Sequence, residues 1–360
     1  PTRLLSSHFS LLTSRPTRDM AAFGSAPAAN ANPNSSFEVP CSPAPDGISS
    51  LNFHPRQNYL IGTSWDNQVR CWEIQQNGTA VPKSATSHTA PVLCSVWKSD
   101  GSCVFTGGCD KQAKQWDLAT SQLTQVAAHD APIRHVSWIH DLNMLVTGSW
   151  DKTLRYWDLR QQSPAHTQTL PDKCYALSVQ YPLLVAGTAE RHIQIFDLQK
   201  PNQVYKQLVS PLRYQTRCVA CFPDKTGYLV GSVEGRVAVQ HVDESMHAKN
   251  FTFKCHREDN DIYAVNHIAF HPTQGTFVTS GADGTFNFWD KENKQRLKAM
   301  AKCPAPIACS TFNHDGTILA YAVSYEWSKG AEAYNPQTAV NKIFLHAVQD
   351  VEVKQRIRKK

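Results

Sequence analysis

The chain has 360 residues, of which 41% are hydrophobic and 18% charged, and its formal net charge is +6. This composition is that of an ordinary folded protein and excludes a largely disordered chain. No stretch approaches 18 consecutive apolar residues, so no membrane-spanning helix and no membrane insertion are expected. The 11 cysteines are odd in number and lack a framework spacing, which favours the reduced thiols of a nuclear or cytosolic protein.

The first 36 residues differ in character from the rest. Residues 1–19 are rich in Ser, Arg and Leu, which superficially fits an organelle transit peptide. Met20, however, opens a stretch of small residues of another kind. We expect Met20 to be the natural start, residues 1–19 to be a translated leader, and residues 1–36 as a whole to form a disordered extension.

An internal repeat organises most of the chain. In four segments an acidic turn residue precedes a Trp by six positions, as Asp66 precedes Trp72. The other three pairs are Asp110 with Trp116, Asp151 with Trp157, and Asp283 with Trp289. Weaker copies place Glu190 before Phe196 and Glu234 before Gln240, and Phe344 follows a long insertion. The anchor position recurs at steps of about 39 to 49 residues before that insertion, which is typical of a four-stranded propeller blade.

Alternating runs between the anchors predict further strands, in chain order Ile48–Phe53, Val92–Trp97, Ile133–Trp138 and Ile268–Phe270. The predicted fold is all-β: a seven-bladed WD-repeat β-propeller over residues 37–350. Because an open sheet edge invites aggregation, we expect Phe37–Cys41 to close the last blade beside residues 342–348. The basic tail, residues 351–360, favours an acidic partner or is simply solvated.

Polar residues at repeated positions look catalytic but have a structural interpretation. His88 and His129 each precede the Trp of their repeat by 28 residues, where they can hydrogen-bond Asp110 and Asp151. A buried carboxylate needs such a partner, and no nucleophile, phosphate-binding or metal motif accompanies these pairs. Cys218 and Cys221 point to opposite faces of a strand, which favours core packing over a zinc site. We therefore expect no catalytic residues, no metal and no cofactor.

Several segments resemble one family in particular. SWDNQVRCWE, GSWDKTLRYWD, SVEGRVAV and FKCHR are similar to the Rae-family mRNA export factors of the nuclear pore, and in part to the mitotic-checkpoint WD-repeat protein. The YEWSKG and AEAYNP segments resemble the export branch more closely. The resemblance covers Phe37 to the C-terminus. It implies a non-enzymatic scaffold that docks on an FG nucleoporin and links mRNA-protein particles to the pore, located in the nucleus, at the nuclear envelope and partly in the cytoplasm.

The resemblance also implies a top-face site for a short hairpin segment with adjacent glutamates. Arg236 would pair with a Glu, because a guanidinium fork binds a carboxylate through two hydrogen bonds. Trp65 and Trp150 would supply aromatic contact, and Arg191 a second cation. The alternative for both Trp residues is that their own blades cover them.

A second expected surface combines aromatic and basic residues on the side of the sixth blade, namely Phe253, Lys254, Trp289, Lys291, Lys294 and Arg296. The resemblance implies a groove for nucleic acid or acidic peptides, and cations beside aromatics suit single-stranded RNA. Trp289 is also a repeat anchor. Two further functions stay open: a spindle-checkpoint adaptor that binds a kinase-borne peptide, and a ubiquitin-ligase substrate receptor that contacts a ligase adaptor. A hydrolase would need converging acids or metal ligands, which the sequence does not provide.

Overall fold

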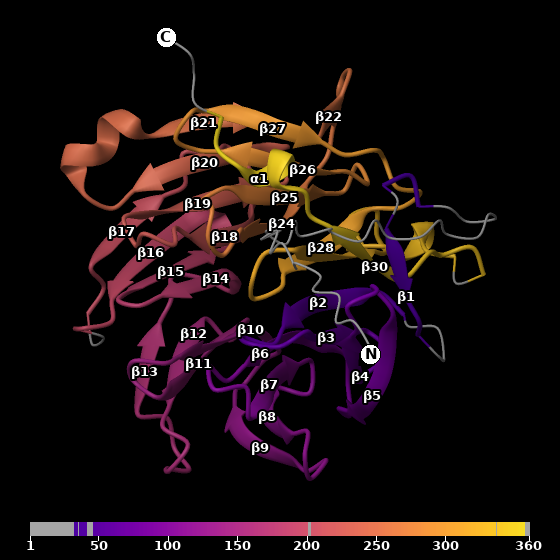
Figure 1. Ribbon diagram of the computed structural model, residues 1–360. Helices are drawn as coiled ribbons and strands as arrows, with labels where there is room; N and C mark the ends of the chain where they lie inside the picture. The colour runs from indigo at the N-terminus through magenta and orange to yellow at the C-terminus, as the bar shows by residue number, and fades with distance from the viewer. Residues whose placement is uncertain (1–31, 35, 42–45, 201–202, 336, 357–360) are drawn as a thin grey trace, which may run out of the picture.

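The computed structural model describes residues 32–356 apart from 35, 42–45, 201–202 and 336. Seven four-stranded antiparallel sheets are arranged around a common axis (Figure 1). The seven-bladed β-propeller predicted from the repeat is therefore confirmed. The expected start at Met20 and the leader 1–19 lie outside the described residues.

The first four blades follow the chain directly. Blade 1 contains β2 (Ile48–Phe53), β3 (Tyr59–Ser64), β4 (Gln68–Ile74) and β5 (Ala80–Ser87). Blade 2 contains β6 (Val92–Trp97), β7 (Cys103–Gly108), β8 (Gln112–Asp117) and β9 (Leu123–Ala128). Blade 3 contains β10 (Ile133–Ile139), β11 (Met144–Ser149), β12 (Thr153–Trp157) and β13 (His166–Thr169). Blade 4 contains β14 (Cys174–Gln180), β15 (Leu183–Thr188), β16 (His192–Asp197) and β17 (Lys206–Val209).

The remaining blades include one hairpin and one long connection. Blade 5 contains β18 (Thr216–Cys221), β19 (Gly227–Ser232), β20 (Arg236–His241) and β21 (Phe251–Lys254), and the hairpin β22 (Arg257–Glu258) and β23 (Asp261–Ile262) follows it. Blade 6 contains β24 (Val265–Phe270), β25 (Phe277–Gly281), β26 (Phe286–Asp290) and β27 (Gln295–Ala299). Blade 7 contains β28 (Ile307–Phe312), β29 (Ile318–Val323), β30 (Lys342–Ala347) and β1 (Phe37–Val39). Short helical turns are Ala189–Arg191, Glu244–Lys249, Ala331–Ala333 and α1 (Asp350–Val353).

The ring closes between the two ends of the chain. β1 pairs antiparallel with β30, with Phe37 opposite Leu345 and Val39 opposite Ile343. Val39 is only 1% exposed, so its side chain fills blade 7 from the open edge. The predicted N-terminal strand is confirmed, and it covers an edge that would otherwise present unpaired backbone groups.

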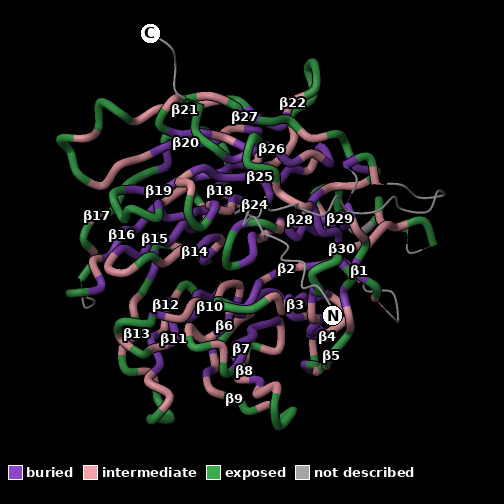
Figure 2. Tube along the Cα trace, in the orientation of Figure 1, coloured by how far each residue is buried: buried purple, intermediate pink, exposed green. Residues whose placement is uncertain are grey.

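Burial decreases from the axis outward. The first strand of each blade lies nearest the axis and contacts the first strands of both neighbouring blades. The second strands β7, β15 and β19 are buried at every position, since neighbouring blades cover both faces. The outer strand β21 instead alternates between half-buried and exposed residues, and Figure 2 shows the same contrast. The hydrophobic core thus lies between the blades.

Both ends of the propeller extend beyond the predicted boundaries. The extension was expected to be disordered up to residue 36, but the side chain of Asn34 accepts a hydrogen bond from Ala301 N at 2.8 Å and donates one to Ala301 O at 3.0 Å. In the expected tail, Val353 is 2% exposed and its carbonyl accepts a hydrogen bond from Thr276 at 2.7 Å. Side-chain hydrogen bonds to backbone groups hold both segments, and apolar burial of Val353 holds the second. Composition alone does not indicate these contacts.

Candidate functional site

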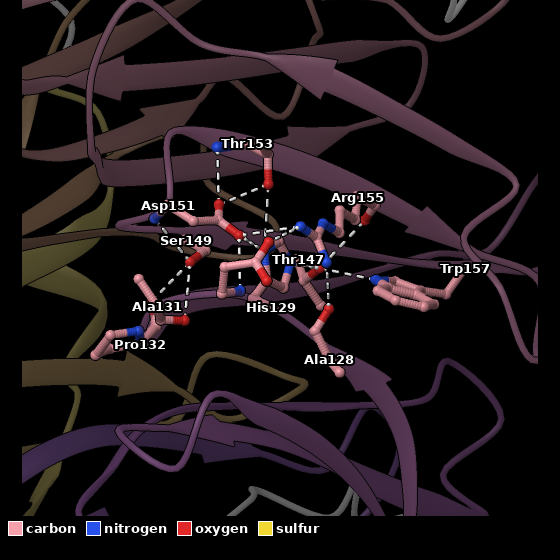
Figure 3. Close-up of polar contacts among 11 residues, drawn as sticks. Ala128, His129, Ala131, Pro132, Thr147, Ser149, Asp151, Thr153, Arg155 and Trp157 are labelled. Carbon is pink, nitrogen blue, oxygen red and sulfur yellow. Dashed lines mark hydrogen bonds and ion pairs between the residues drawn. The ribbon is translucent and has the colours of Figure 1, made fainter.

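Buried networks of Asp, His and Thr fix the turns of blades 2, 3 and 6, and in blades 3 and 6 a Trp joins the network. In blade 3, His129 Nδ1 lies 2.8 Å from Asp151 Oδ2 and its Nε2 lies 2.7 Å from Thr147 Oγ1 (Figure 3). Trp157 Nε1 donates to the same hydroxyl at 2.8 Å. Burial acts to raise the pKa of Asp151, but hydrogen bonds from Thr153 and the contact with His129 outweigh it and lower the pKa below its ordinary value.

The predicted structural role of these His-Asp pairs accords with this geometry. The order Asp151, His129, Thr147 resembles a hydrolytic triad, but Thr147 is 0% exposed. No substrate can reach a hydroxyl that is fully buried and already receives a hydrogen bond from an indole. Blade 2 repeats the His-Asp contact, with His88 Nδ1 2.9 Å from Asp110 Oδ2.

A third network was missed from the sequence. In blade 6, His256 Nδ1 lies 2.9 Å from Asp283 Oδ1, and Trp289 Nε1 donates to Thr279 at 2.9 Å. His256 precedes its Asp by 27 residues instead of the 22 seen in blade 2, because the hairpin β22–β23 lies between them. The local spacing signal was therefore lost.

The four residues predicted to bind a partner lie on one face of the ring. Trp65, Trp150 and Arg191 occupy the connection between the second and third strands of their blades, and Arg236 is the first residue of β20, directly after that connection. Because the antiparallel order is the same in every blade, these connections meet on the same side, which we call the top face. The long insertion of blade 7, residues 324–341, joins β29 to β30 on this face too.

Arg236 belongs to a basic patch on blades 4 and 5. Its Nε lies 3.7 Å from Glu234 Oε2, and its side chain is 32% exposed. This distance exceeds that of a hydrogen bond, so the guanidinium retains donors for an external carboxylate. Arg191 has fewer donors left for a partner, because its Nη1 donates to the carbonyl oxygens of Leu212 at 3.0 Å and Arg213 at 3.2 Å.

Three further residues of this patch were not predicted. Arg257 Nη2 donates to Glu234 O at 2.8 Å, and Arg213 N donates to Glu234 Oε1 at 2.8 Å. Tyr214 is 61% exposed beside them. These residues lie in the connections between blades, outside the repeat. We define the arginine patch as Arg191, Arg213, Tyr214, Arg236 and Arg257.

The two top-face Trp residues are half-buried. Trp65 packs against Trp327 of the blade 7 insertion, with ring centroids 5.9 Å apart, and Trp327 in turn lies 4.8 Å from Tyr334. The insertion therefore covers part of Trp65. Trp150 has a buried indole nitrogen without a hydrogen-bond partner among the described residues. Both expose less surface than the sequence suggested.

Residues of the second predicted surface lie together on blades 5 and 6. Phe253 of β21 packs against Trp289 of β26 with ring centroids 4.6 Å apart. Arg296 lies 6.0 Å from the Trp289 ring, and Lys294 lies 4.8 Å from the ring of Phe251. Lys254 is exposed and stands opposite Arg236 in the β20–β21 register. The side surface is thus continuous with the arginine patch.

Lys291 differs from the expectation. It is only 8% exposed, and its Nζ contacts the carboxylates of Glu292 and, at 3.6 Å, Asp224. Its ammonium also lies 4.6 Å from the ring of Phe222. The ammonium of Lys291 therefore already has carboxylate partners, although Lys291 and Lys294 both line a pocket of 220 Å³ with Phe251 and Lys249.

The cysteines behave as core residues. Cys218 Sγ points to Val265 O of blade 6 at 3.5 Å, and Cys221 Sγ points to Ser178 O of blade 4 at 3.4 Å. Burial raises the pKa of both thiols to about 12. All 11 cysteines are free thiols. Within the described ranges no group of three His, Cys, Asp or Glu side chains could hold a metal ion, and no helix there is long and apolar enough to span a membrane.

The fold and its repeats define the chain as a WD-repeat β-propeller. Residues 37–73, 81–117, 120–158 and 248–290 match the family described as WD domain, G-beta repeat. The chain is 64% identical to Protein RAE1 of Arabidopsis thaliana over 94% of its own length and 98% of the relative's. It is 48% identical to the mRNA export factor of Xenopus tropicalis (94% and 95% covered) and 46% identical to the Poly(A)+ RNA export protein of Schizosaccharomyces pombe (88% and 92%).

At this identity and coverage, the chain belongs to the Rae-family of mRNA export factors. The family resemblance drawn from SVEGRVAV and YEWSKG is thereby confirmed. The chain is a non-enzymatic interaction protein, as its propeller repeats and its relatives establish.

Proposed function

We propose that this protein acts in mRNA export at the nuclear pore, where its top face docks a short glutamate-bearing segment of an FG nucleoporin. Through this contact it links mRNA-protein particles to the pore. The relatives' names support the export role. A protein with this role is located in the nucleus and at the nuclear envelope, and partly in the cytoplasm.

The observation that carries the docking proposal is the arginine patch. Four arginines of blades 4 and 5 and of the connections that follow these blades lie near Glu234 and the Leu212–Arg213 segment. Glu234 accepts a hydrogen bond from Arg213 N, and its carboxylate lies 3.7 Å from Arg236 Nε. A partner carboxylate can therefore approach Arg236 more closely than Glu234 does. Charge-assisted hydrogen bonds of this kind are strong once desolvated. Tyr214, which is 61% exposed, provides an aromatic surface beside them.

The test is a titration of the full chain with a glutamate-containing FG-nucleoporin peptide. Arg236→Ala is expected to weaken binding by roughly 2 kcal/mol or more, which is about 30-fold. Arg160→Ala is the matched control, because Arg160 pairs with Asp158 at 2.6 Å between the third and fourth strands, on the opposite face. Melting temperatures are compared first. Equal binding by both variants, or no binding by the wild type, would refute the docking site.

The side surface supports a second candidate, direct contact with single-stranded RNA. Base stacking on Phe253 and phosphate contacts from Lys254, Lys294 and Arg296 form a suitable combination. Replacing Lys294 and Arg296 with Gln should weaken binding to a uridine homopolymer and reduce its salt dependence. Lys291→Gln should leave RNA binding nearly unchanged, since Lys291 is buried among its own carboxylate partners. An equal loss of RNA binding in the Lys294 and Arg296 variant and in the Lys291 variant would contradict an RNA site on the side surface.

A further inference from the structure

The outer strand of blade 4 differs from the other outer strands in its exposed side chains. Six large hydrophobic residues are exposed in the described part of the chain, and three of them, Tyr205, Leu208 and Val209, lie within five positions at β17. Their exposed fractions are 55%, 43% and 53%. The outer strands β1, β5, β9, β13, β21 and β27 carry none of the remaining three. Exposed apolar side chains that cluster in this way mark a surface for a partner.

β17 also has an open backbone edge. Among the described residues it is the last strand of its sheet, and it pairs there with β16 alone. Figure 1 shows β17 at the outer rim of the ring. Ser210 N donates to Arg191 O at 2.8 Å, and in an antiparallel ladder alternate residues share this direction. The backbone groups of Leu208 therefore face β16, whereas those of Gln207 and Val209 face away from it.

The lysine of this strand does not protect the open edge. Edge strands commonly avoid pairing with other chains by placing a Lys where a further strand would add. Lys206 Nζ instead donates to Val242 O at 3.0 Å and to Glu244 Oε1 at 3.1 Å, both in the connection between β20 and β21. Its side chain is 22% exposed. Because the ammonium is held against the neighbouring blade, the edge of β17 stays accessible.

The segment that carries β17 is basic. No Asp or Glu occurs in residues 198–223, and Lys200 and Arg213, which flank the strand in sequence, are both exposed. Glu244 pairs with Lys206, but Glu244 is 79% exposed, and a pair so close to solvent contributes little. A partner with negative charge is therefore favoured at this edge. A second copy of the chain is disfavoured, because its own β17 is equally basic.

We propose that β17 is a docking edge, to which an extended partner segment of alternating apolar and acidic residues adds as a fifth strand of blade 4. Lys206 and Leu208 lie on one face of β17, and Gln207 and Val209 lie on the other. The added segment would place its carboxylates on the face of Lys206 and its apolar side chains on the face of Val209. Main-chain hydrogen bonds to Gln207 and Val209 supply affinity, and the side chains supply specificity. The site goes beyond the docking proposed at the arginine patch and does not require it.

The experiment measures binding of a fluorescein-labelled eight-residue peptide of alternating Glu and Val to the full chain by fluorescence anisotropy. We expect saturable binding that weakens with added salt. Replacing every Glu of the peptide with Lys should weaken binding at least about tenfold, because the strand is basic. Methylating every backbone amide of the peptide should abolish binding, since methylation removes the main-chain donors and keeps the side chains.

Two variants of the chain test the edge itself. Gln207→Pro removes a donor that faces away from β16 and leaves the ladder to β16 intact, so it should weaken peptide binding at least about tenfold. Leu208→Ser combined with Val209→Ser removes the apolar contacts and should weaken binding to a similar extent. This double variant and the methylated peptide decide the question if Gln207→Pro lowers the melting temperature.

The matched control is Thr167→Pro in β13, the outer strand of blade 3. Leu170 N donates to Lys152 O at 2.8 Å, so the N–H of Thr167 also points away from its sheet. β13 carries no exposed large hydrophobic residue, and Thr167→Pro should leave peptide binding unchanged. An equal loss for Thr167→Pro and Gln207→Pro would show that the peptide does not select β17, which would overturn the proposal.

The other outcomes identify a different occupant or none. Lost binding in Arg236→Ala would overturn the proposal, because the peptide would then occupy the arginine patch. Unchanged binding of the methylated peptide, or no binding by the wild type, would also overturn it. Sedimentation equilibrium tests the second copy: a wild-type dimer that Gln207→Pro dissociates would mean that β17 pairs with itself, against the proposal.

Discussion

The three buried hydroxyls Thr106, Thr147 and Thr279 allow a quantitative test of the turn networks. Each is 0% exposed and lies 2.7 or 2.8 Å from a histidine Nε2. Thr147 and Thr279 also accept a hydrogen bond from the Trp of their blade. Trp116 of blade 2 instead has a buried indole nitrogen with no partner in the described structure. The same substitution therefore removes a different number of hydrogen bonds in different blades.

Replacing Thr with Val keeps the volume and removes the hydroxyl. A buried donor or acceptor left without a partner costs about 1–3 kcal/mol. Thr147→Val leaves both His129 Nε2 and Trp157 Nε1 unsatisfied, so we expect a loss of about 2–5 kcal/mol in the free energy of unfolding. Both hydroxyls also donate to a strand carbonyl, at 3.4 Å for Thr106 and 3.2 Å for Thr147. Thr106→Val leaves His88 Nε2 unsatisfied but removes no Trp hydrogen bond, so its loss should be about half as large.

The assay is urea unfolding of the full chain, followed by both circular dichroism and tryptophan fluorescence to check that the transitions coincide. Thr279→Val should match Thr147→Val, because blade 6 has the complete network. Equal losses in all three variants would refute the reasoning, since the Trp hydrogen bond would then contribute nothing. A larger loss of unfolding free energy for Thr106→Val than for the other two variants would refute the reasoning more strongly.

Two further predictions concern the closing strand and the buried histidines. Removing residues up to Pro45 should lower the melting temperature sharply. Val39→Asp should lower the free energy of unfolding by more than about 3 kcal/mol because it buries a charge. Glu38→Gln, at an exposed position of the same strand, should leave the free energy of unfolding nearly unchanged. An unchanged melting temperature after truncation would contradict the closure. Burial lowers the pKa of His267 to about 4 and of His135 to about 3, from 6.5. The unfolded chain therefore binds more protons between pH 6.5 and 4, and stability should fall across this range by about 2 kcal/mol per histidine at pH 5. His267→Gln should remove about half of that fall in urea unfolding at pH 7 and 5.

The propeller itself could be predicted because its signal is local. An Asp in a tight turn and a Trp six residues later lie in one hairpin, so Asp151 and Trp157 identify their blade without any long-range contact. His256 was missed for the same reason. It binds Asp283 across an inserted hairpin, and an insertion changes the spacing while the contact is kept.

The binding surfaces were only partly predictable, since they depend on contacts between distant residues. Arg213 and Arg257 lie in connections with no periodic pattern, and only the fold brings both beside Glu234. Lys291 looked available in the sequence because its partner Asp224 stands 67 positions earlier, in another blade. Charge and aromatic content locate the general region of such a surface. They do not determine which cation is already paired.

The bulges of the inner strands show which features of these strands the fold requires and which it does not. A bulge is a backbone feature that bends the strand and increases its twist, and here it recurs in all seven blades. The side chains at that position range from Ala308 and Ser49 to Tyr175 and Arg134, so the backbone does not dictate them. A small residue would avoid the desolvation of a charge near the axis, as Ala308 and Ser49 do. Arginine at two of these positions, Arg134 and Arg217, is thus not required by the bulge itself.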